Sequence, residues 1–156
     1  MVQEGTRAPS FRLKDSSGRE RRLDEFSGKW AVLYFYPRDD TSGCTLEALE
    51  FSALEEDFKN LGAVVVGISP DTCESHARFI GKHNLTVLLL SDPEKKVLEL
   101  YGAWRIKKMY GKESMGVARS TVLVSPRGEV AKTWKSVRAA SHAARVLEVI
   151  REMARA

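Results

Sequence analysis

Two apolar stretches decide the fold: AVLYFY at residues 31–36 and AVVVGI at residues 63–68. Both have the length of a strand and are rich in β-branched or aromatic residues, which is typical of strands buried on both faces of a sheet. Pro37 ends the first stretch, because proline cannot donate a hydrogen bond to a neighbouring strand. Residues 45–60 carry leucines and phenylalanines at helical spacing and glutamates in the early turns, which favours a helix. The pattern therefore predicts a strand–helix–strand unit with parallel strands.

The remaining sequence predicts further strands and helices around this unit. We expect hairpins from residues 11–14 with 20–23 and from 121–124 with 130–134, a strand at 86–90, helices at 71–83, 95–101 and 141–153, and a basic loop at 104–116. Asp71 and Glu74 have the spacing of a capping box at the start of the helix at 71–83. This order predicts an α/β, thioredoxin-like fold with an N-terminal hairpin and a central mixed sheet flanked by helices. A doubly wound nucleotide-binding domain is the competing fold, but no Gly-x-Gly-x-x-Gly or Walker-type sequence follows either strand.

Composition narrows the class of protein. The chain has 156 residues, and we expect residues 1–156 to form a single domain. Its apolar runs are far shorter than the roughly 20 residues that cross a bilayer, so we expect no membrane partner. Charges of both signs are interspersed and sum to 25 − 21 = +4, which argues against a nucleic-acid partner. The N-terminus lacks the apolar core of a signal peptide, so we expect a cytoplasmic protein.

Residue types that carry chemistry are concentrated in YFYPRDDTSGCT at residues 34–45. Functional sites in parallel α/β sheets gather at the carboxyl ends of strands, where this segment lies. A cysteine in the first turn of a helix also faces unpaired backbone N–H groups and the positive end of the helix dipole, and both favour the nucleophilic thiolate. The position of Cys44 therefore predicts a reactive cysteine; a small side chain buried in the core is the alternative interpretation.

The spacing Pro-x-x-x-Thr-x-x-Cys in this segment resembles the active-site motif of peroxiredoxins, specifically of the PrxQ (bacterioferritin comigratory protein) subfamily. Further similar blocks are GISPDTCESHARF at 67–79, LLSDPEKKVLELYGAW at 89–104, KKMYGKESMGVARSTVLV at 107–124 and WKSV at 134–137. The resemblance implies a thiol-dependent peroxidase that reduces hydrogen peroxide and organic hydroperoxides through a cysteine sulfenic acid. It implies thioredoxin or another thiol donor as the reductant partner, and a monomer or weak dimer. It implies no metal, haem or flavin cofactor, because the cysteine itself takes up the oxidising equivalent.

The same resemblance assigns roles to four residues. Cys44 is the peroxidatic cysteine, whose thiolate attacks one peroxide oxygen. Thr41 would hydrogen-bond the peroxide, Pro37 would wall the pocket, and Arg119 would place a positive charge beside the sulfur. Ordinary alternatives remain open: Thr41 as a helix N-cap, Pro37 as the end of a strand, and Arg119 as a surface ion-pair partner.

Several other polar or aromatic residues are expected to have structural or solvent roles. We expect Arg38, Asp39 and Asp40 to be solvated turn residues, His76, His83 and His142 to lie on helix surfaces without metal-ligand spacing, Lys107, Lys108 and Lys112 to lie in a solvent loop, and Trp104 and Trp134 to pack against the core. The sequence thus predicts no metal site.

The second cysteine departs from the subfamily pattern. Many members form a disulfide with a cysteine at the position of Leu49 or near that of Ile80, and this chain has a cysteine at neither. Cys73 is the only other thiol, two helical turns before Ile80 on the same helix face. Three routes of recycling stay open: Cys73 resolves Cys44 within one chain, an external thiol reduces Cys44 directly, or a disulfide forms between chains.

A function of another class is also compatible with these residues. The chain could be a peroxide sensor or a non-catalytic thioredoxin-fold interaction module, in which oxidation of Cys44 signals without turnover. An idle module would be expected to have lost Thr41 or Arg119, and both are present. The sequence therefore favours the enzyme.

Overall fold

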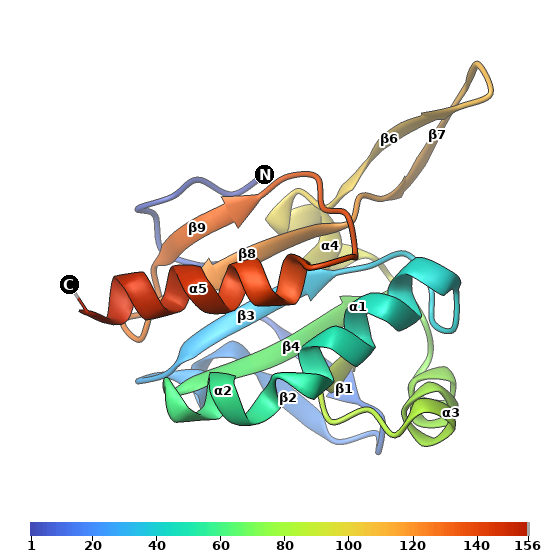
Figure 1. The fold of residues 1–156 in the computed structure, drawn as a ribbon. Coiled ribbons are helices and arrows are strands. Elements are labelled where there is room, and N and C mark those ends of the chain that lie inside the picture. The colour runs from blue at the N-terminus through green and yellow to red at the C-terminus, as the bar shows by residue number, and fades with distance from the viewer. Residues whose placement is uncertain (156) are drawn as a thin grey trace.

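The computed structural model describes residues 1–155, and Figure 1 shows a central sheet with helices packed on it. Seven strands form the sheet in the order β2-β1-β5-β4-β3-β8-β9, and β6 and β7 form a separate ribbon. The strands are β1 (Arg12–Asp15), β2 (Glu20–Arg22), β3 (Trp30–Phe35), β4 (Ala63–Ser69), β5 (Leu88–Ser91), β6 (Trp104–Met109), β7 (Lys112–Val117), β8 (Ser120–Val124) and β9 (Val130–Trp134). The α-helices are α1 (Ser42–Ala53), α2 (Glu55–Asn60), α3 (Cys73–His83), α4 (Lys96–Tyr101) and α5 (His142–Arg155), and a 3-10 helix (Leu23–Phe26) follows β2.

The strand–helix–strand unit has the predicted form. β3 pairs in parallel with β4, from Trp30 opposite Ala63 to Phe35 opposite Ile68, and β4 pairs in parallel with β5. β8 lies antiparallel along the other side of β3, and β1 lies antiparallel along β5. The sheet is therefore mixed, as predicted, and the carboxyl ends of β3 and β4 meet at one edge.

The sheet separates two apolar clusters. Alternate residues of β3 belong to different clusters, because successive side chains of a strand point to opposite faces. One cluster includes Phe51 and Cys44 and lies under α1, α2, α3 and α5. The other includes Phe11 and lies with α4 and the N-terminal segment. Trp134 packs against the first cluster and Trp104 against the second, as predicted.

The helix expected at residues 45–60 is two helices. α1 ends at Ala53 and α2 begins at Glu55, with Leu54 between them. Three acidic residues, Glu55, Glu56 and Asp57, fill the first turn of α2. Negative charge is favourable at a helix N-terminus, so the local charge stabilises a new start where the apolar spacing alone indicated continuity.

The loop expected at residues 104–116 is instead the ribbon of β6 and β7, which projects from the body in Figure 1. Tyr110 and Gly111 connect its strands with φ of 52° and 75°. Two consecutive positive φ angles give the turn that matches the twist of a hairpin. Lys108 and Lys112 are exposed, as expected, whereas Lys107 is half-buried.

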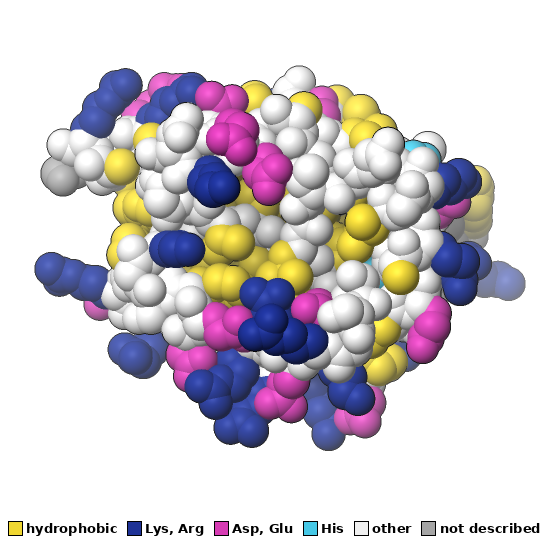
Figure 2. Space-filling model, turned by 90° about the horizontal axis from the view of Figure 1, so that it is seen from below, with side chains coloured by type: hydrophobic (Ala, Val, Ile, Leu, Met, Phe, Trp, Pro, Cys, Tyr) yellow, Lys and Arg dark blue, Asp and Glu magenta, His cyan; other side chains and the backbone are white. Residues whose placement is uncertain are grey.

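The surface agrees with the mixed charge of the sequence. Figure 2 shows basic and acidic side chains interspersed around an apolar area on one face. Among residues 1–155, no helix is both long and apolar enough to cross a membrane.

Candidate active site

Cys44 lies in the first turn of α1, as predicted. β3 ends at Phe35, the chain crosses residues 36–41, and α1 begins at Ser42 with Thr41 as its N-cap. The residue is 1% exposed and belongs to the apolar cluster under α1. Its thiol is free. The sulfur is thus buried, but a charged group also reaches it.

That charged group is the guanidinium of Arg119. Arg119 directly precedes β8, whose Ser120 lies opposite Phe35 at the end of β3, so the register brings it to the loop that follows β3. Its Nη2 donates to Cys44 Sγ at 3.2 Å. Gly43 permits this approach, since a Cβ there would lie 3.0 Å from Nη2. Arg119 is therefore not the surface ion-pair partner that the sequence left open.

The guanidinium is shared with a carboxylate. Arg119 Nη1 donates to Glu47 Oε1 at 2.7 Å, and Glu47 is fully buried. Burial opposes the charge of Arg119, but the neighbouring Cys44 and Glu47 outweigh it and raise the pKa of Arg119. One fixed positive charge thus faces both the sulfur and the carboxyl group.

The sequence does not single out Glu47, which is one of the glutamates that favour an early helical turn. Burial raises the pKa of Glu47 to about 7, although Arg119 acts in the opposite direction. Its Oε2 has no hydrogen-bond partner among the described residues. The available signal was its place one turn after Cys44, on the face of α1 that enters the core.

This buried carboxyl makes stability depend on pH. The pKa of Glu47 is raised from 4.5 to about 7 in the folded protein, so its contribution to stability is complete below about pH 4.5 and is lost as the pH rises through 7. Two and a half pKa units correspond to about 3 kcal/mol. We compare Glu47→Gln with its parent, both in a Cys44→Ser background. As the pH rises from 5 to 8, the free energy of unfolding of the variant should increase by about 2–3 kcal/mol relative to that of the parent, because only the parent loses stability as Glu47 ionises.

Urea unfolding of the two proteins at both pH values measures this difference. The Cys44→Ser background removes the reactive thiol beside Glu47. A difference that stays constant from pH 5 to pH 8 would contradict the assignment of a raised pKa to Glu47.

Thr41 and Pro37 lie on the same loop. Thr41 is the N-cap by backbone conformation, but its hydroxyl donates to the carbonyl of Arg38 at 3.0 Å, and its side chain makes no capping hydrogen bond in the described structure. Thr41 is therefore the N-cap by position, as one interpretation of the sequence had it, without a capping hydrogen bond from its side chain among the described residues. Pro37 lies two residues after the end of β3 and is partly exposed, while Thr41 is exposed.

The same loop contains the clearest correction to the sequence analysis. Asp39, expected to be solvated, is 8% exposed, and His76, expected on a helix surface, is fully buried. Asp39 Oδ2 lies 2.7 Å from His76 Nδ1. The two residues are 37 positions apart, so no local pattern could reveal the pair. Arg38 and Asp40 are exposed, as expected.

The other two histidines also have side-chain partners. His142 is buried and its Nε2 lies 2.8 Å from Thr121 Oγ1, so its expected surface position is wrong. Burial lowers the pKa of His142 to about 4, and Arg145 and Arg119 add to this effect. His83 is half-buried and its Nε2 lies 2.8 Å from Asp40 Oδ1.

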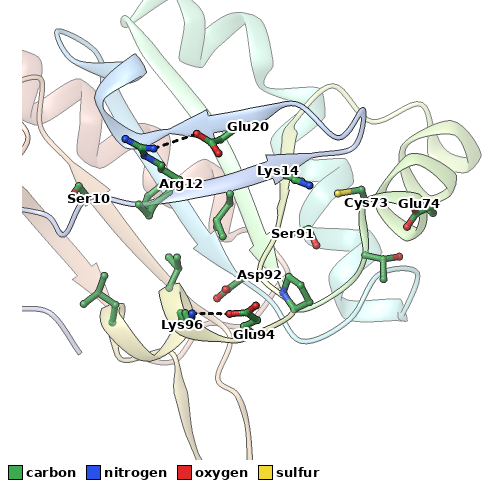
Figure 3. A pocket seen from close by; sticks show the side chains of 16 residues that line it. Ser10, Arg12, Lys14, Glu20, Cys73, Glu74, Ser91, Asp92, Glu94 and Lys96 are labelled. Atoms are coloured by element: carbon green, nitrogen blue, oxygen red, sulfur yellow. Dashed lines mark ion pairs between the residues drawn. The ribbon is translucent and has the colours of Figure 1, made fainter.

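Cys73 is the first residue of α3. Thr72, not Asp71, caps this helix, because Thr72 Oγ1 accepts from the backbone N–H of Ser75 at 3.1 Å. Cys73 is half-buried and lines a cavity of about 670 Å³ with residues of β1, β5 and α4 (Figure 3). Phe11, which also lines this cavity, belongs to the cluster on the face of the sheet opposite that of Cys44. Cys73 therefore opens toward a different part of the molecule, and both thiols are free.

One group of residues has ligand atoms close enough for a metal ion. Side-chain atoms of Asp39, Asp71 and His76 lie within 4.8 Å of one another. Protein hydrogen bonds already engage these groups: Asp71 Oδ2 accepts from Ser69 Oγ, and both ring nitrogens of His76 have partners. The arrangement is a hydrogen-bonded network within the protein.

The chain is similar to known proteins over most of its length. Residues 5–133 match the AhpC/TSA family. The chain is 43% identical to peroxiredoxin Bcp of Bacillus subtilis over 152 residues, which cover 97% of each chain. It is 48% identical over 147 residues to a Helicobacter pylori protein described as a putative peroxiredoxin bcp, covering 94% of this chain and 97% of that one.

Solved structures give the same result. A bacterioferritin comigratory protein of Xanthomonas campestris, studied for its alkyl peroxide reduction activity, superimposes with a TM-score of 0.91 at 36% identity and covers 97% of this chain and 99% of that one. A PrxQ variant of Xylella fastidiosa superimposes with a TM-score of 0.94 at 31% identity, covering 99% and 98% of the two chains. The thioredoxin-like fold expected from the order of elements is thereby confirmed.

Proposed function

The chain belongs to the AhpC/TSA family as a peroxiredoxin of the Bcp (PrxQ) type, and from this premise we propose that Cys44 is the thiol that reduces peroxide, with Arg119, Thr41 and Pro37 around it. The protein is a thiol-dependent peroxidase. One observation carries the assignment of Cys44: the Arg119 guanidinium lies 3.2 Å from Cys44 Sγ at the N-terminus of α1. Cys73 has no such partner in the described structure, where it lines a cavity away from Arg119.

The proposed reaction is a displacement at oxygen. The Cys44 thiolate attacks one oxygen of the peroxide, an S–O bond forms, and the O–O bond breaks. Sulfur is oxidised to a sulfenic acid, and the leaving oxygen takes a proton and departs as water or an alcohol. Negative charge moves from sulfur toward the leaving oxygen, where Arg119 and the amides at the start of α1 stabilise it without rearrangement.

Thr41 and Pro37 complete this proposal. Thr41 lies one helical turn before Cys44, and its hydroxyl is both a donor and an acceptor. We assign it to the peroxide oxygens, since among the described residues its hydroxyl bonds the Arg38 carbonyl of the same loop and no other group. Pro37 stands near the start of the same loop, and we assign its apolar ring to the wall that limits access of water to the sulfur.

A thiol donor then returns the sulfenic acid to the thiol. We propose Cys73 as the internal resolving cysteine: its thiol condenses with the Cys44 sulfenic acid, a disulfide forms, and water leaves. Cα atoms of a disulfide must lie roughly 4.4–6.8 Å apart. Because both thiols are free and Cys73 lines a cavity with residues of β1, β5 and α4, the first turns of α1 and α3 must open for this step, and helix ends open at low cost.

Peptide mapping tests the internal step. After one equivalent of hydrogen peroxide per chain, we expect a non-reduced peptide that joins Cys44 to Cys73 within a monomer. A monomer whose Cys44 carries the oxidant while Cys73 remains an alkylatable thiol would contradict this step and establish direct reduction by an external thiol. Disulfide-linked dimers would contradict it in favour of the intermolecular route.

Thioredoxin or a similar protein dithiol is the proposed external donor, and the cytoplasm the proposed compartment, since free thiols persist in reducing surroundings. We propose a monomer or weak dimer. Peroxide consumption with a thioredoxin system tests the cycle: continuous turnover supports the enzyme, whereas one oxidation event without turnover by any thiol donor supports a peroxide sensor.

A further inference from the structure

We propose that the buried Asp39–His76 pair is a positioning device for the reacting thiol, because it holds the loop that carries Thr41 against α3 and so fixes the start of α1 around Cys44. The proposal rests on Cys44 being the thiol that peroxide oxidises. It adds two residues that touch neither the sulfur nor the peroxide in the proposed reaction.

Both carboxylate oxygens and the backbone N–H of Asp39 have hydrogen-bond partners. Its Oδ1 accepts from the Tyr36 hydroxyl at 2.6 Å, and its Oδ2 accepts from the Ser75 hydroxyl at 2.8 Å and lies 2.7 Å from His76 Nδ1. Its backbone N–H donates to Asp71 Oδ2 at 2.8 Å. Burial by itself would raise the pKa of Asp39, but the hydrogen bonds from His76, Tyr36 and Ser75 hold it below its usual range.

The histidine has a partner at each ring nitrogen. His76 Nδ1 faces Asp39 Oδ2, and Nε2 lies 3.0 Å from the carbonyl oxygen of Leu90. The Tyr36 hydroxyl, which is 3.4 Å from Nδ1, donates to Asp39. Removal of the ring therefore leaves the buried Asp39 carboxylate with one hydrogen-bond partner fewer.

The pair joins the two segments that follow the parallel strands β3 and β4. Asp39 lies in the loop after β3, and His76 lies in the first turns of the helix that follows β4. Cys44 is only five residues after Asp39. The intervening chain contains Asp40 in the left-handed region with φ of 60°, which aspartate adopts more readily than most non-glycine residues.

From Asp40 the loop continues directly into the site. The Thr41 hydroxyl donates to the Arg38 carbonyl, and the Thr41 carbonyl accepts from the N–H of Thr45 at 2.8 Å, which closes the first turn of α1. An anchor at Asp39 therefore sets the position of Thr41 and of the turn that contains Cys44.

The chain offers a matched control two turns of α3 further on. Asp40 and His83 form a similar pair at 2.8 Å, but the Asp40 side chain is 43% exposed. Exposed pairs contribute little. Replacement of His76 and of His83 by alanine thus removes the same chemical group from the same helix, once from a buried anchor and once from an exposed contact.

The test uses the full chain with Cys73→Ser as the reference, so that Cys44 is the only thiol. Rapid-quench mass spectrometry measures the rate constants for oxidation of Cys44 by hydrogen peroxide and for its alkylation by iodoacetamide, and a melting curve records folding. We expect His76→Ala to slow oxidation about ten-fold or more, because small misplacements of reacting groups have effects of this size. Alkylation should be unchanged or faster, because a looser loop exposes the buried sulfur. His83→Ala should change both rates less than about two-fold.

Conservative variants separate positioning from folding. His76→Asn keeps a donor toward Asp39 and should restore the oxidation rate to within about three-fold of the reference. Tyr36→Phe removes one hydrogen bond to Asp39 without altering the ring and should slow oxidation about three-fold; it tests the proposal if His76→Ala does not fold.

Three results would overturn the proposal: folded His76→Ala that oxidises at the reference rate, equal losses of oxidation and alkylation, or Tyr36→Phe at the reference rate when His76→Ala is unfolded. A reference protein whose Cys44 does not react with peroxide would instead overturn the proposed role of Cys44.

Discussion

Peroxide consumption is expected to fall by at least about a thousand-fold when Cys44 is replaced by serine, because the residue that carries the oxidising equivalent is lost. Serine has nearly the size of cysteine and accepts a hydrogen bond from Arg119, so the fold should persist. The hydroxyl is not ionised near neutral pH and cannot displace an oxygen from a peroxide. Continuous peroxide assays with a thioredoxin system, beside a melting curve for each protein, measure this effect.

Cys73→Ser is the matched control for this substitution. It removes the other thiol, and we expect it still to consume one equivalent of peroxide per chain, because Cys44 remains. A Cys44→Ser protein that retains the wild-type rate would show that another group reduces peroxide and would refute the assignment.

Loss of the Arg119 guanidinium should have the second-largest effect. Arg119→Ala is expected to lower kcat/KM for hydrogen peroxide by about a hundred-fold or more, the usual result of removing one pre-organised donor from a site where negative charge develops. The guanidinium reaches Cys44 Sγ at 3.2 Å and Glu47 at 2.7 Å. A lysine cannot serve both groups in this forked geometry, so Arg119→Lys should retain an intermediate activity, about ten-fold below wild type.

Arg105→Ala is a suitable control for the Arg119 variant. Arg105 is also partly buried, but its guanidinium donates to the carbonyls of Gly102 and Lys135. We expect it to change kcat/KM less than about three-fold. An Arg119→Ala protein that melts normally and keeps its full kcat/KM would remove the electrostatic part of the mechanism.

Local pattern predicted the elements that position the site. The strands at 31–36 and 63–68 are central because their apolar residues face both sides of the sheet, and parallel pairing follows from the helices between them. The ribbon at 104–116 was not predicted, since its turn depends on positive φ at Tyr110 as well as at Gly111. Tyrosine gives no signal for that conformation.

The site itself was predicted unevenly. The place of Cys44 at a helix start could be derived from the sequence, whereas Arg119 entered only through the resemblance, because 75 residues separate it from Cys44. Glu47 and His76 were assigned to solvent-facing or helix-stabilising roles. Both are charged or polar residues whose burial depends on a distant partner, and spacing along one element does not report such partners.

Trapping of the first oxidation product shows whether the sulfur of Cys44 is the atom that peroxide oxidises. The Cys73→Ser protein is treated with one equivalent of hydrogen peroxide in the presence of dimedone, which labels sulfenic acids, and its peptides are mapped. We expect one dimedone adduct per chain, on Cys44. An unlabelled Cys44 thiol in a folded protein, with the peroxide left unconsumed or the oxidant found on a methionine, would contradict it.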